Sequence, residues 1–282
     1  MLNKLTSLAR RAIDNYNLIS DGDKIAVGLS GGKDSITLAT ILKHYSRFSK
    51  NKFSVIAIII DLFDGKTDYS SLLEYCKSID LEVHIVNSKI YDVVFNIKKE
   101  GNPCSLCAKL RRGILNNCAK ELGCNKVALG HHSDDVLETF MMSLFYEGRI
   151  STFMPSTYME DCDITVIRPM IYIKEESIIH FSKHLPIVHN CCPADKKTKR
   201  QYFKDLLNQI NTENPNAKER MLTALIHSER ANLIPATSEF IEKHNKKEQD
   251  KIQRRKVQNT EKATRLKANK MFKISSTSKD DN

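Results

Sequence analysis

The sequence predicts an α/β protein: a parallel sheet with helices on both faces, an N-terminal helix and a helical, basic C-terminal region. Two observations lead to this class. Short apolar runs alternate with segments of helical spacing, which is typical of parallel strands joined by helical crossovers. The run at residues 53–61 (FSVIAIIID) is rich in β-branched residues and apolar on both faces, as expected of a strand covered on both sides.

The elements follow from the same patterns. Leu5, Leu8, Ala12 and Tyr16 recur at three- and four-residue steps and predict the N-terminal helix. Apolar runs between turn residues predict strands, and apolar residues at helical spacing predict the remaining helices. The predicted strands are 24–29, 53–61, 82–86, 126–129 and 165–167; the further helices are 34–48, 69–79, 108–122, 136–146, 174–184, one beyond residue 195 and one near 221–226.

Length and charge indicate the domain organisation. With 282 residues the chain suffices for one large domain or two small ones. We expect an N-terminal helix at 1–20, a main domain at 21–210, a C-terminal helix at 211–242 and a basic, loosely ordered tail at 243–282. The net charge is +10, and the tail holds 13 basic and five acidic residues, a local excess of +8. Such a stretch either contacts phosphate backbones or is simply a solvated tail.

Several protein classes are excluded by composition. The longest aliphatic run, residues 55–60, is too short to cross a bilayer, and the N-terminus lacks the apolar core of a secretory signal. The eight cysteines are too sparse for a disulfide-stapled scaffold, which indicates a reducing compartment. We therefore expect a cytoplasmic protein without a membrane partner.

A glycine-rich segment, residues 30–35 (SGGKDS), lies directly between a predicted strand and a predicted helix. Backbone N–H groups at a helix start bind anions, and glycines allow close approach to phosphate. Lys33 adds a compact charge, and Ser30 and Ser35 add hydroxyl donors. Asp34 indicates an accompanying divalent cation. The pattern predicts a phosphate loop distinct from the G-x-x-x-x-G-K-S/T type; a glycine-rich turn without ligand is the alternative.

A second polar loop, residues 130–135 (GHHSDD), follows the predicted strand 126–129. Open α/β sheets bind ligands at the carboxyl ends of their strands, and adjacent carboxylates beside phosphates need Mg²⁺ to bridge the charges. A helix cap at Ser133 or Asp134 is the alternative, and the two roles are compatible. Asp61, at another strand end, is a weaker candidate because strand-end aspartates also begin turns.

The cysteines form two groups, Cys104 with Cys107 in a C-x-x-C, and the adjacent pair Cys191 and Cys192. A C-x-x-C by itself fits a redox disulfide, half of a zinc site or half of an iron–sulfur site. His189 and the later pair could complete four zinc ligands. Three thiolates would instead suit a 4Fe-4S cluster with one open iron. These residues alone leave the choice open.

The surrounding residues resemble the TtcA family of tRNA 2-thiocytidine biosynthesis proteins, which belongs to the PP-loop ATP pyrophosphatases. SGGKDS after a hydrophobic strand is similar to the PP-loop itself. Further matches occur in the family's order and cover roughly residues 1–201; they are 103–115 (PCSLCAKLRRGIL), 130–140 (GHHSDDVLETF), 144–149 (LFYEGR), 154–155 (MP) and 167–170 (IRPM).

This resemblance implies a Rossmann-like, adenine nucleotide alpha hydrolase-like fold and an ATP-dependent tRNA sulfurtransferase. ATP and Mg²⁺ would activate the ring carbonyl of an anticodon-loop cytidine by adenylation, with pyrophosphate and AMP as products, and a 4Fe-4S cluster would deliver sulfur. The catalytic residues would be Ser35, Lys33, Arg111 and Asp134. The ATP-binding residues would be Gly28, Leu29, Ser30, Gly31, Gly32, Lys33, Asp34, Ser35, Asp61, Gly130, His131 and Asp135.

The cluster ligands implied by the resemblance are Cys104, Cys107 and Cys192. The family carries a C-x-x-C before a basic segment ending in Arg-Gln, and anchoring on residues 200–201 places its second cysteine at Cys192. His189 stands where the first would be, so Cys191 is the rival ligand.

The implied partners are tRNA, a sulfur donor such as a cysteine desulfurase, and a second copy of the chain in a homodimer. RNA contact is expected from basic residues at 196–200 and from the tail. Aromatic content of 7% without Trp argues against a broad stacking platform, and the target cytidine is expected to leave its stack for a small pocket. Arg111 and Arg112 could orient phosphate or RNA, or simply form an exposed basic helix face.

Two other functions remain open. One is a PP-loop tRNA-modifying or amidating ligase whose cysteines bind zinc. The other, from a different class, is a nucleotide-regulated dithiol redox or RNA-binding protein.

Overall fold

The computed structural model describes residues 1–98, 103–188 and 199–233, together with residues 246, 249 and 253. One compact unit spans Met1–Ile226, and His227–Asn282 forms a second unit, which begins with the short helix η3 (Ser228–Arg230). Most of the predicted basic tail therefore lies outside the described residues. No helix in the described ranges has both the length and the apolar character needed to span a membrane.

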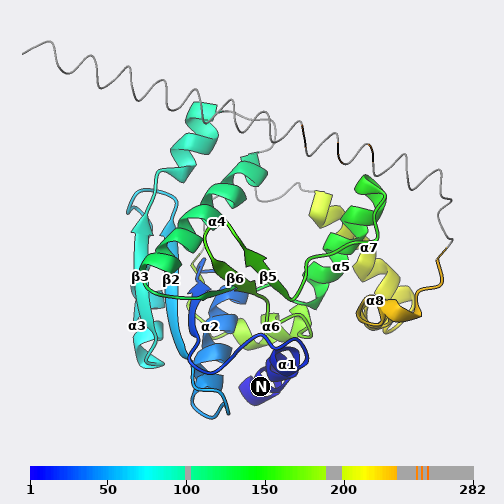
Figure 1. Cartoon of the computed structure of the whole chain (residues 1–282), viewed down its shortest axis with the longest axis horizontal. Coiled ribbons are helices and arrows are strands. Elements are labelled where there is room, and N and C mark those ends of the chain that lie inside the picture. The colour runs from blue at the N-terminus through cyan, green and yellow to red at the C-terminus, as the bar shows by residue number, and fades with distance from the viewer. Residues whose placement is uncertain (99–102, 189–198, 234–245, 247–248, 250–252, 254–282) are drawn as a thin grey trace, which may run out of the picture. The chain divides into compact units, whose positions relative to one another are not determined.

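A six-stranded sheet forms the centre of the first unit (Figure 1). Five strands are parallel, which confirms the predicted class, and β5 pairs antiparallel with β6 at the edge. The strands lie in the order β3-β2-β1-β4-β6-β5. Their bounds are β1 Lys24–Gly28, β2 Ser54–Asp61, β3 Glu82–Asn87, β4 Lys126–Ala128, β5 Ser156–Met159 and β6 Ile164–Ile167.

The edge strand β5 is not predicted from the sequence. It is four residues long, and none of those residues is buried, so no apolar run marks it. An antiparallel edge strand is held by hydrogen bonds to its neighbour and can form without a hydrophobic pattern of its own.

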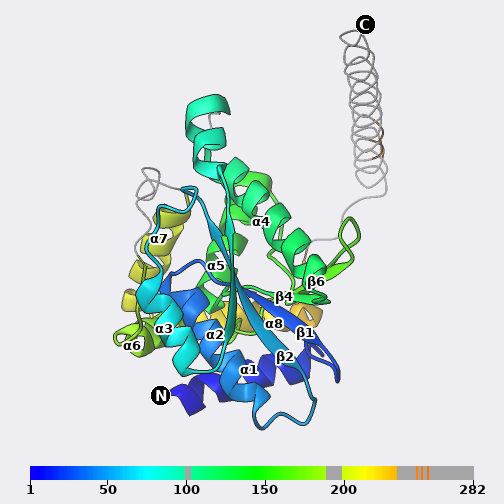
Figure 2. The same ribbon diagram turned by 90° about the vertical axis from the view of Figure 1, so that its left-hand side faces the viewer.

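Helices cover both faces of the sheet, as predicted. The helices α1 (Leu2–Asn15), α2 (Lys33–Ser46), α3 (Ser70–Ser78) and α6 (Glu175–Ser182) pack on one face. The other face carries α4 (Pro103–Glu121) and the π-helical turn η1 (Asp92–Lys98), and Figure 2 shows α2 and α4 on opposite sides. Successive residues of β2 enter different cores: Val55, Ala57 and Ile59 face α2, whereas Ile56, Ile58 and Ile60 face α4.

A further group of helices lies beside the sheet. It consists of α5 (Ser133–Met142), its π-helical continuation η2 (Ser143–Glu147), α7 (Lys199–Glu213) and α8 (Ala217–Ile226). Leu137, Met141, Phe203 and Leu207 form the buried core between α5 and α7. Figure 1 shows these helices together on the right of the sheet.

Helix α4 begins five residues earlier than predicted and therefore includes the C-x-x-C. Its first residue is Pro103, a residue well suited to the first position of a helix. Leu106 and Leu110 in these early turns are four residues apart and pack against the core beneath α4, a helical pattern that the prediction from residue 108 onward did not include.

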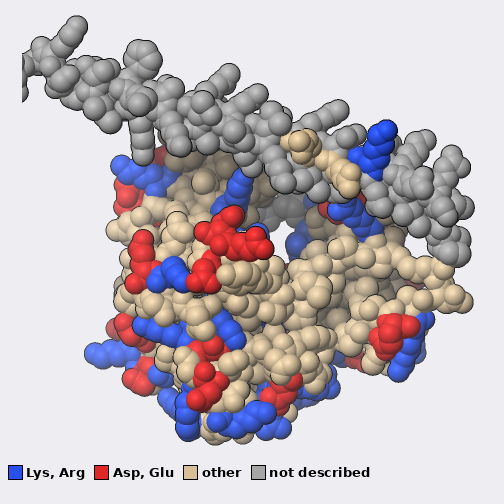
Figure 3. Space-filling view, in the orientation of Figure 1, with Lys and Arg blue, Asp and Glu red and all other residues tan. Residues whose placement is uncertain are grey.

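Charged side chains of both signs are interspersed on the face of the described residues seen in Figure 3. This agrees with the near balance of charge outside the tail, where the excess of basic residues is small.

Candidate nucleotide-binding and active site

A cavity of about 380 Å³ opens at the carboxyl ends of the central strands. The loop after β1, the loop after β4, two residues of β2 and one face of α4 surround it. Its lining includes nine of the residues that the sequence singled out. They are Gly28, Leu29, Ser30, Asp34, Ser35, Arg111, Gly130, His131 and Asp135, and the lining also includes Arg112, Leu115 and Asn116.

The loop after β1 wraps around the hydroxyl of Ser35. The backbone N–H of Ser30 donates to Ser35 Oγ at 3.1 Å, and Ser35 Oγ donates to the carbonyl of Gly32 at 3.0 Å. Gly31 adopts a left-handed φ of +83°, which a residue with a side chain rarely adopts. The loop therefore ends with the N-terminus of α2 directed at the cavity, where an anion is favoured.

Gly130 brings the second loop against the first. A Cβ atom on Gly130 would lie 3.0 Å from the carbonyl carbon of Asp34 and 3.2 Å from the backbone nitrogen of Ser35. Only glycine permits the two backbones to approach this closely, so the two predicted loops form one site.

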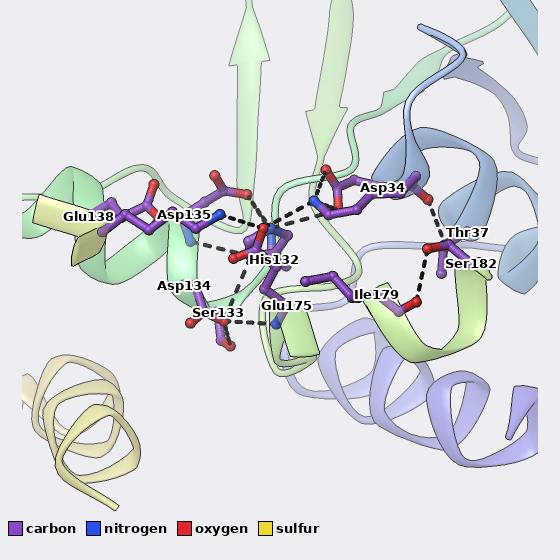
Figure 4. Close-up of polar contacts among 12 residues, drawn as sticks. Asp34, Thr37, His132, Ser133, Asp134, Asp135, Glu138, Glu175, Ile179 and Ser182 are labelled. Atoms are coloured by element: carbon purple, nitrogen blue, oxygen red, sulfur yellow. Dashed lines mark hydrogen bonds and ion pairs between the residues drawn. The ribbon is translucent and has the colours of Figure 1, made fainter. Parts of the chain in front are cut away.

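His132, which is not among the site residues predicted from the sequence, links the two carboxylates of the cavity (Figure 4). Its Nε2 lies 3.7 Å from Asp34 Oδ1 and 3.4 Å from Asp135 Oδ2. Its Nδ1 accepts from the backbone N–H of Asp135, while the Asp135 carboxylate accepts from the N–H of His132, a reciprocal cap of α5. The Nδ1 contact leaves the ring proton on Nε2, facing the carboxylates. The three-residue spacing of a capping box is the signal that could have found His132.

Lys33 points to a different set of partners. Its Nζ lies 2.9 Å from Asp34 Oδ1 and 3.1 Å from Glu175 Oε1, and Lys204 contacts the same Glu175 carboxylate at 2.7 Å. Burial by itself would lower the pKa of Lys33. The carboxylates of Asp34 and Glu175 have the larger effect, so the pKa is raised. Lys33 is not among the residues that line the cavity. Sequence spacing did not point to Glu175 or Lys204.

His131 faces the cavity as a neutral imidazole. Burial is the main cause that lowers its pKa to about 4; Arg168 and Arg200 add to this, whereas Asp135 opposes it. The ring packs against Phe153 with a centroid distance of 4.9 Å. Its Nδ1 is buried and has no hydrogen-bond partner within the described residues.

Two of the predicted carboxylates do not line the cavity. Asp134 accepts from the backbone N–H of Glu175 at 2.8 Å and from Lys218 Nζ at 2.9 Å. Asp61 accepts from Thr67 Oγ1 at 2.6 Å and from the backbone N–H of Gly65. In both cases burial by itself would raise the carboxyl pKa. The hydrogen bonds have the larger effect, so the pKa is lowered. Both side chains are engaged in holding the loops that follow or adjoin the strands.

The C-x-x-C occupies the first turn of α4. Cys104 is exposed and Cys107 is half-buried. Because Cys104, Ala108 and Arg111 are four and three residues apart, they share one face of the helix, and Ala108 and Arg111 line the cavity. Cys104 therefore shares the helix face of Ala108 and Arg111 at the N-terminal end of α4, although neither Cys104 nor Cys107 is among the residues that line the cavity.

Cys191, Cys192 and His189 lie outside the described residues, but both flanks of that segment contact the site. Val188 donates its N–H to the carbonyl of Gly31 at 3.0 Å. On the other side Arg200 lies 3.2 Å from Asp135 Oδ1. Within the described ranges no group of three or more His, Cys, Asp or Glu residues could hold a metal ion.

A parallel sheet with a glycine-rich loop opening on a cavity at the strand ends defines an α/β nucleotide-binding protein. Residues 4–209 match the model of the PP-loop domain family. The chain is 39% identical over 237 residues to the tRNA-cytidine(32) 2-sulfurtransferase of Pseudomonas paraeruginosa, covering 83% of this chain and 85% of that protein. The same enzyme of Stutzerimonas stutzeri is 38% identical with the same coverage. The chain therefore belongs to the PP-loop family and, within it, to the TtcA family.

A solved structure supports this fold. The U34-tRNA thiolase NcsA from Methanococcus maripaludis, a structure with its 4Fe-4S cluster, aligns with a TM-score of 0.63 and 25% identity. The alignment covers 80% of this chain and 79% of that one.

Proposed function

We propose that this PP-loop enzyme of tRNA thiolation converts an anticodon-loop cytidine to 2-thiocytidine, with ATP activating the ring carbonyl. One observation carries the proposal: the phosphate loop and the arginine face of α4, whose first turn holds the C-x-x-C, surround the same cavity. Nucleotide activation and sulfur transfer need to occur at the same base, and this arrangement allows both. The name of the curated relatives points to a tRNA cytidine as the substrate. The name of the solved neighbour supports tRNA thiolation but gives U34 as its target.

The phosphate loop would hold the pyrophosphate end of ATP. The N-terminus of α2 offers backbone N–H groups, and the hydroxyls of Ser30 and Ser35, 3.1 Å apart, can donate to phosphate oxygens. Asp34 and Asp135 are suited to Mg²⁺, because this ion is usually held by one or two carboxylates together with the substrate's phosphates. A bound Mg²⁺ would neutralise phosphate charge.

In the first step the 2-carbonyl oxygen of cytidine attacks the α-phosphorus of ATP. A new O–P bond forms, and the bond from the α-phosphorus to the bridging oxygen breaks as pyrophosphate leaves. Arg111 and Arg112, both on the cavity wall, would stabilise the charge that builds up on the phosphate oxygens. Lys33 would add its charge after exchanging Glu175 for phosphate. In the second step a sulfur nucleophile bonds to C2, and the activated oxygen leaves with AMP.

Cys104, Cys107 and a cysteine of the 191–192 pair would hold the 4Fe-4S cluster. Cysteine thiolates are the ligands that such clusters require. Such a cluster would supply the sulfur for the second step. A sulfur donor such as a cysteine desulfurase, a second copy of the chain and action in the cytoplasm are parts of the same proposal.

Nucleoside analysis of cellular tRNA tests the proposal. Cells lacking the protein are expected to lose 2-thiocytidine and to regain it with the wild-type chain or with Cys124→Ala, which changes a buried thiol away from the cavity. Cys107→Ala should not restore it. Unchanged 2-thiocytidine in cells without the protein would refute the function. With purified protein, release of pyrophosphate from ATP should rise when tRNA is added.

The third ligand is tested separately. Anaerobically prepared Cys192→Ala should lose the brown colour of the cluster, and Cys191→Ala should keep it. The reverse result would assign the ligand to Cys191. Colourless wild-type protein that binds zinc would instead favour the amidating-ligase alternative.

A further inference from the structure

Three large aromatic side chains gather on the surface at η2 and α7. Phe145, Tyr146 and Tyr202 are 64%, 51% and 61% exposed. Their ring centroids lie 5.5, 5.6 and 5.2 Å from that of Phe203, which is only 1% exposed. We refer to Phe145, Tyr146 and Tyr202 as the aromatic cluster. Although aromatic residues are only 7% of the chain, the fold brings these three together.

The aromatic cluster is held by the core beneath it. Phe203 packs with Leu137, Met141 and Leu207, which join α5 to α7. The exposed rings therefore rest on a buried aromatic ring in a well-packed core. Exposed apolar surface of this kind, supported by rigid elements, is typical of a binding surface.

Basic groups accompany the rings. Lys199 Nζ lies 4.3 Å from the ring centroid of Tyr146, a cation–π contact, and Arg149 is exposed next to η2. Two acidic groups lie near the rings. Glu147 accepts from Ser143 Oγ at 3.3 Å, and Asp205, three residues from Tyr202 on α7, accepts from Gln201 Nε2 at 2.8 Å. Aromatic rings with adjacent cations suit a ligand that has both flat bases and phosphates.

The aromatic cluster is close to the cavity. Helix α5 leads from Asp135, on the cavity wall, to η2, and the ten residues from Asp135 to Phe145 correspond to about 15 Å of helix. On α7, Arg200 contacts Asp135 while Tyr202 is two residues further along. Figure 1 shows α5 and α7 side by side. A nucleotide a few positions from one bound in the cavity could therefore reach these rings.

We propose that the aromatic cluster stacks with unpaired bases of the tRNA anticodon loop that neighbour the cytidine in the cavity, with Lys199 near a phosphate. The inference rests on the proposed function and adds the surface that positions its RNA. Stacking tolerates any base, because every base has a π-face, and protein recognition of RNA loops commonly uses unstacked bases on aromatic side chains.

Binding of a labelled, unmodified anticodon stem-loop RNA to the full chain tests this inference. Tyr146→Ala and Tyr202→Ala should each weaken binding by roughly 5- to 150-fold, the range that corresponds to the loss of one stacked base. Tyr146→Phe keeps the ring and should bind like the wild type. Phe48→Ala is the matched control, because Phe48 is 55% exposed but lies past the far end of α2, away from the cavity.

Lys199→Gln gives an independent measurement that requires no ring to be removed. It should reduce the slope of log Kd against log salt concentration by about one, as expected for one lost phosphate contact. ATP hydrolysis without RNA should be unchanged in all these variants, and their melting temperatures should stay close to that of the wild type.

RNA affinity that is unchanged in both tyrosine variants and an unchanged salt slope for Lys199→Gln would overturn the inference. A second result would also overturn it: tyrosine variants that bind RNA like the wild type but no longer dimerise, or no longer bind a sulfur-donor protein. The aromatic cluster would then be a surface for a protein partner. These outcomes leave the proposed function intact. Failure of the wild-type chain to bind the RNA would instead count against the proposed function itself.

Discussion

Val188 packs directly on Gly31 of the phosphate loop. The Val188 N–H donates to the Gly31 carbonyl at 3.0 Å, and a Cβ atom on Gly31 would lie 2.8 Å from Val188 Cβ. The chain that leads to the cysteine pair is therefore joined to the loop that would hold ATP, at a position that has no room for a side chain.

Gly31→Ala is expected to impair ATP binding and to destabilise the fold. A left-handed alanine costs about 1–2 kcal/mol, and the contact with Val188 adds to it. Gly22→Ala is the matched control, because Gly22 has nearly the same φ, +82°, with no neighbouring atom within 4 Å. Thermal denaturation should show a lower melting temperature for both variants. ATP titration should show a loss of ATP affinity only for Gly31→Ala. Equal ATP affinity in both variants would contradict this role of the contact.

His131 should make stability depend on pH. Its pKa is 6.5 in an unfolded chain and about 4 here. Between these values the unfolded chain binds a proton that the folded protein does not, so stability falls as the pH drops from 6.5 towards 4, by up to about 3 kcal/mol.

Denaturant unfolding of His131→Gln should show a shallower loss over that pH window. His180→Gln, a change at an exposed histidine, should keep the wild-type slope. Identical slopes for the wild type and His131→Gln would show that His131 titrates normally.

The family resemblance predicts that Asp134 is catalytic, whereas its contacts indicate a structural role. The two roles can be distinguished by experiment. Removing its partner by Lys218→Met should destabilise the protein by about 1–3 kcal/mol, because a buried carboxylate loses a charged donor. If Asp134 acts through structure, the kcat of folded Lys218→Met should match that of folded Asp134→Asn. A kcat that falls steeply in Asp134→Asn and not in Lys218→Met would support the catalytic role.

Thiol reactivity should separate the surface cysteine from the buried ones. Burial raises the pKa of Cys76 to about 11 and also raises that of Cys124, whereas Cys104 is exposed in the first turn of α4. In reduced, cluster-free protein at neutral pH, iodoacetamide should modify Cys104 well before Cys76 or Cys124. Mass spectrometry of peptides after short exposures would measure this. Modification of Cys76 at the same rate would show that its burial is transient.

Much of the architecture follows from local pattern. The apolar run of β2 predicts a strand buried on both faces, and the SGGKDS segment between strand and helix predicts where an anion would be held. These features depend on residues that are neighbours along the chain, so spacing and residue type are enough to identify them. The same holds for the C-x-x-C, which lies in the first turn of α4, before the predicted start of that helix.

Other features required the folded chain. His132 meets Asp34, Lys33 meets Glu175, and Val188 meets Gly31. The partners in each pair come from segments that follow different strands of the sheet. Tyr146 and Tyr202 likewise share one surface only because α5 and α7 pack through Phe203. The spacing of residues in the sequence predicts contacts within one helix or strand. Contacts between distant segments depend on the order and register of the strands. That arrangement is selected by burial of the two hydrophobic cores, which involves the whole chain.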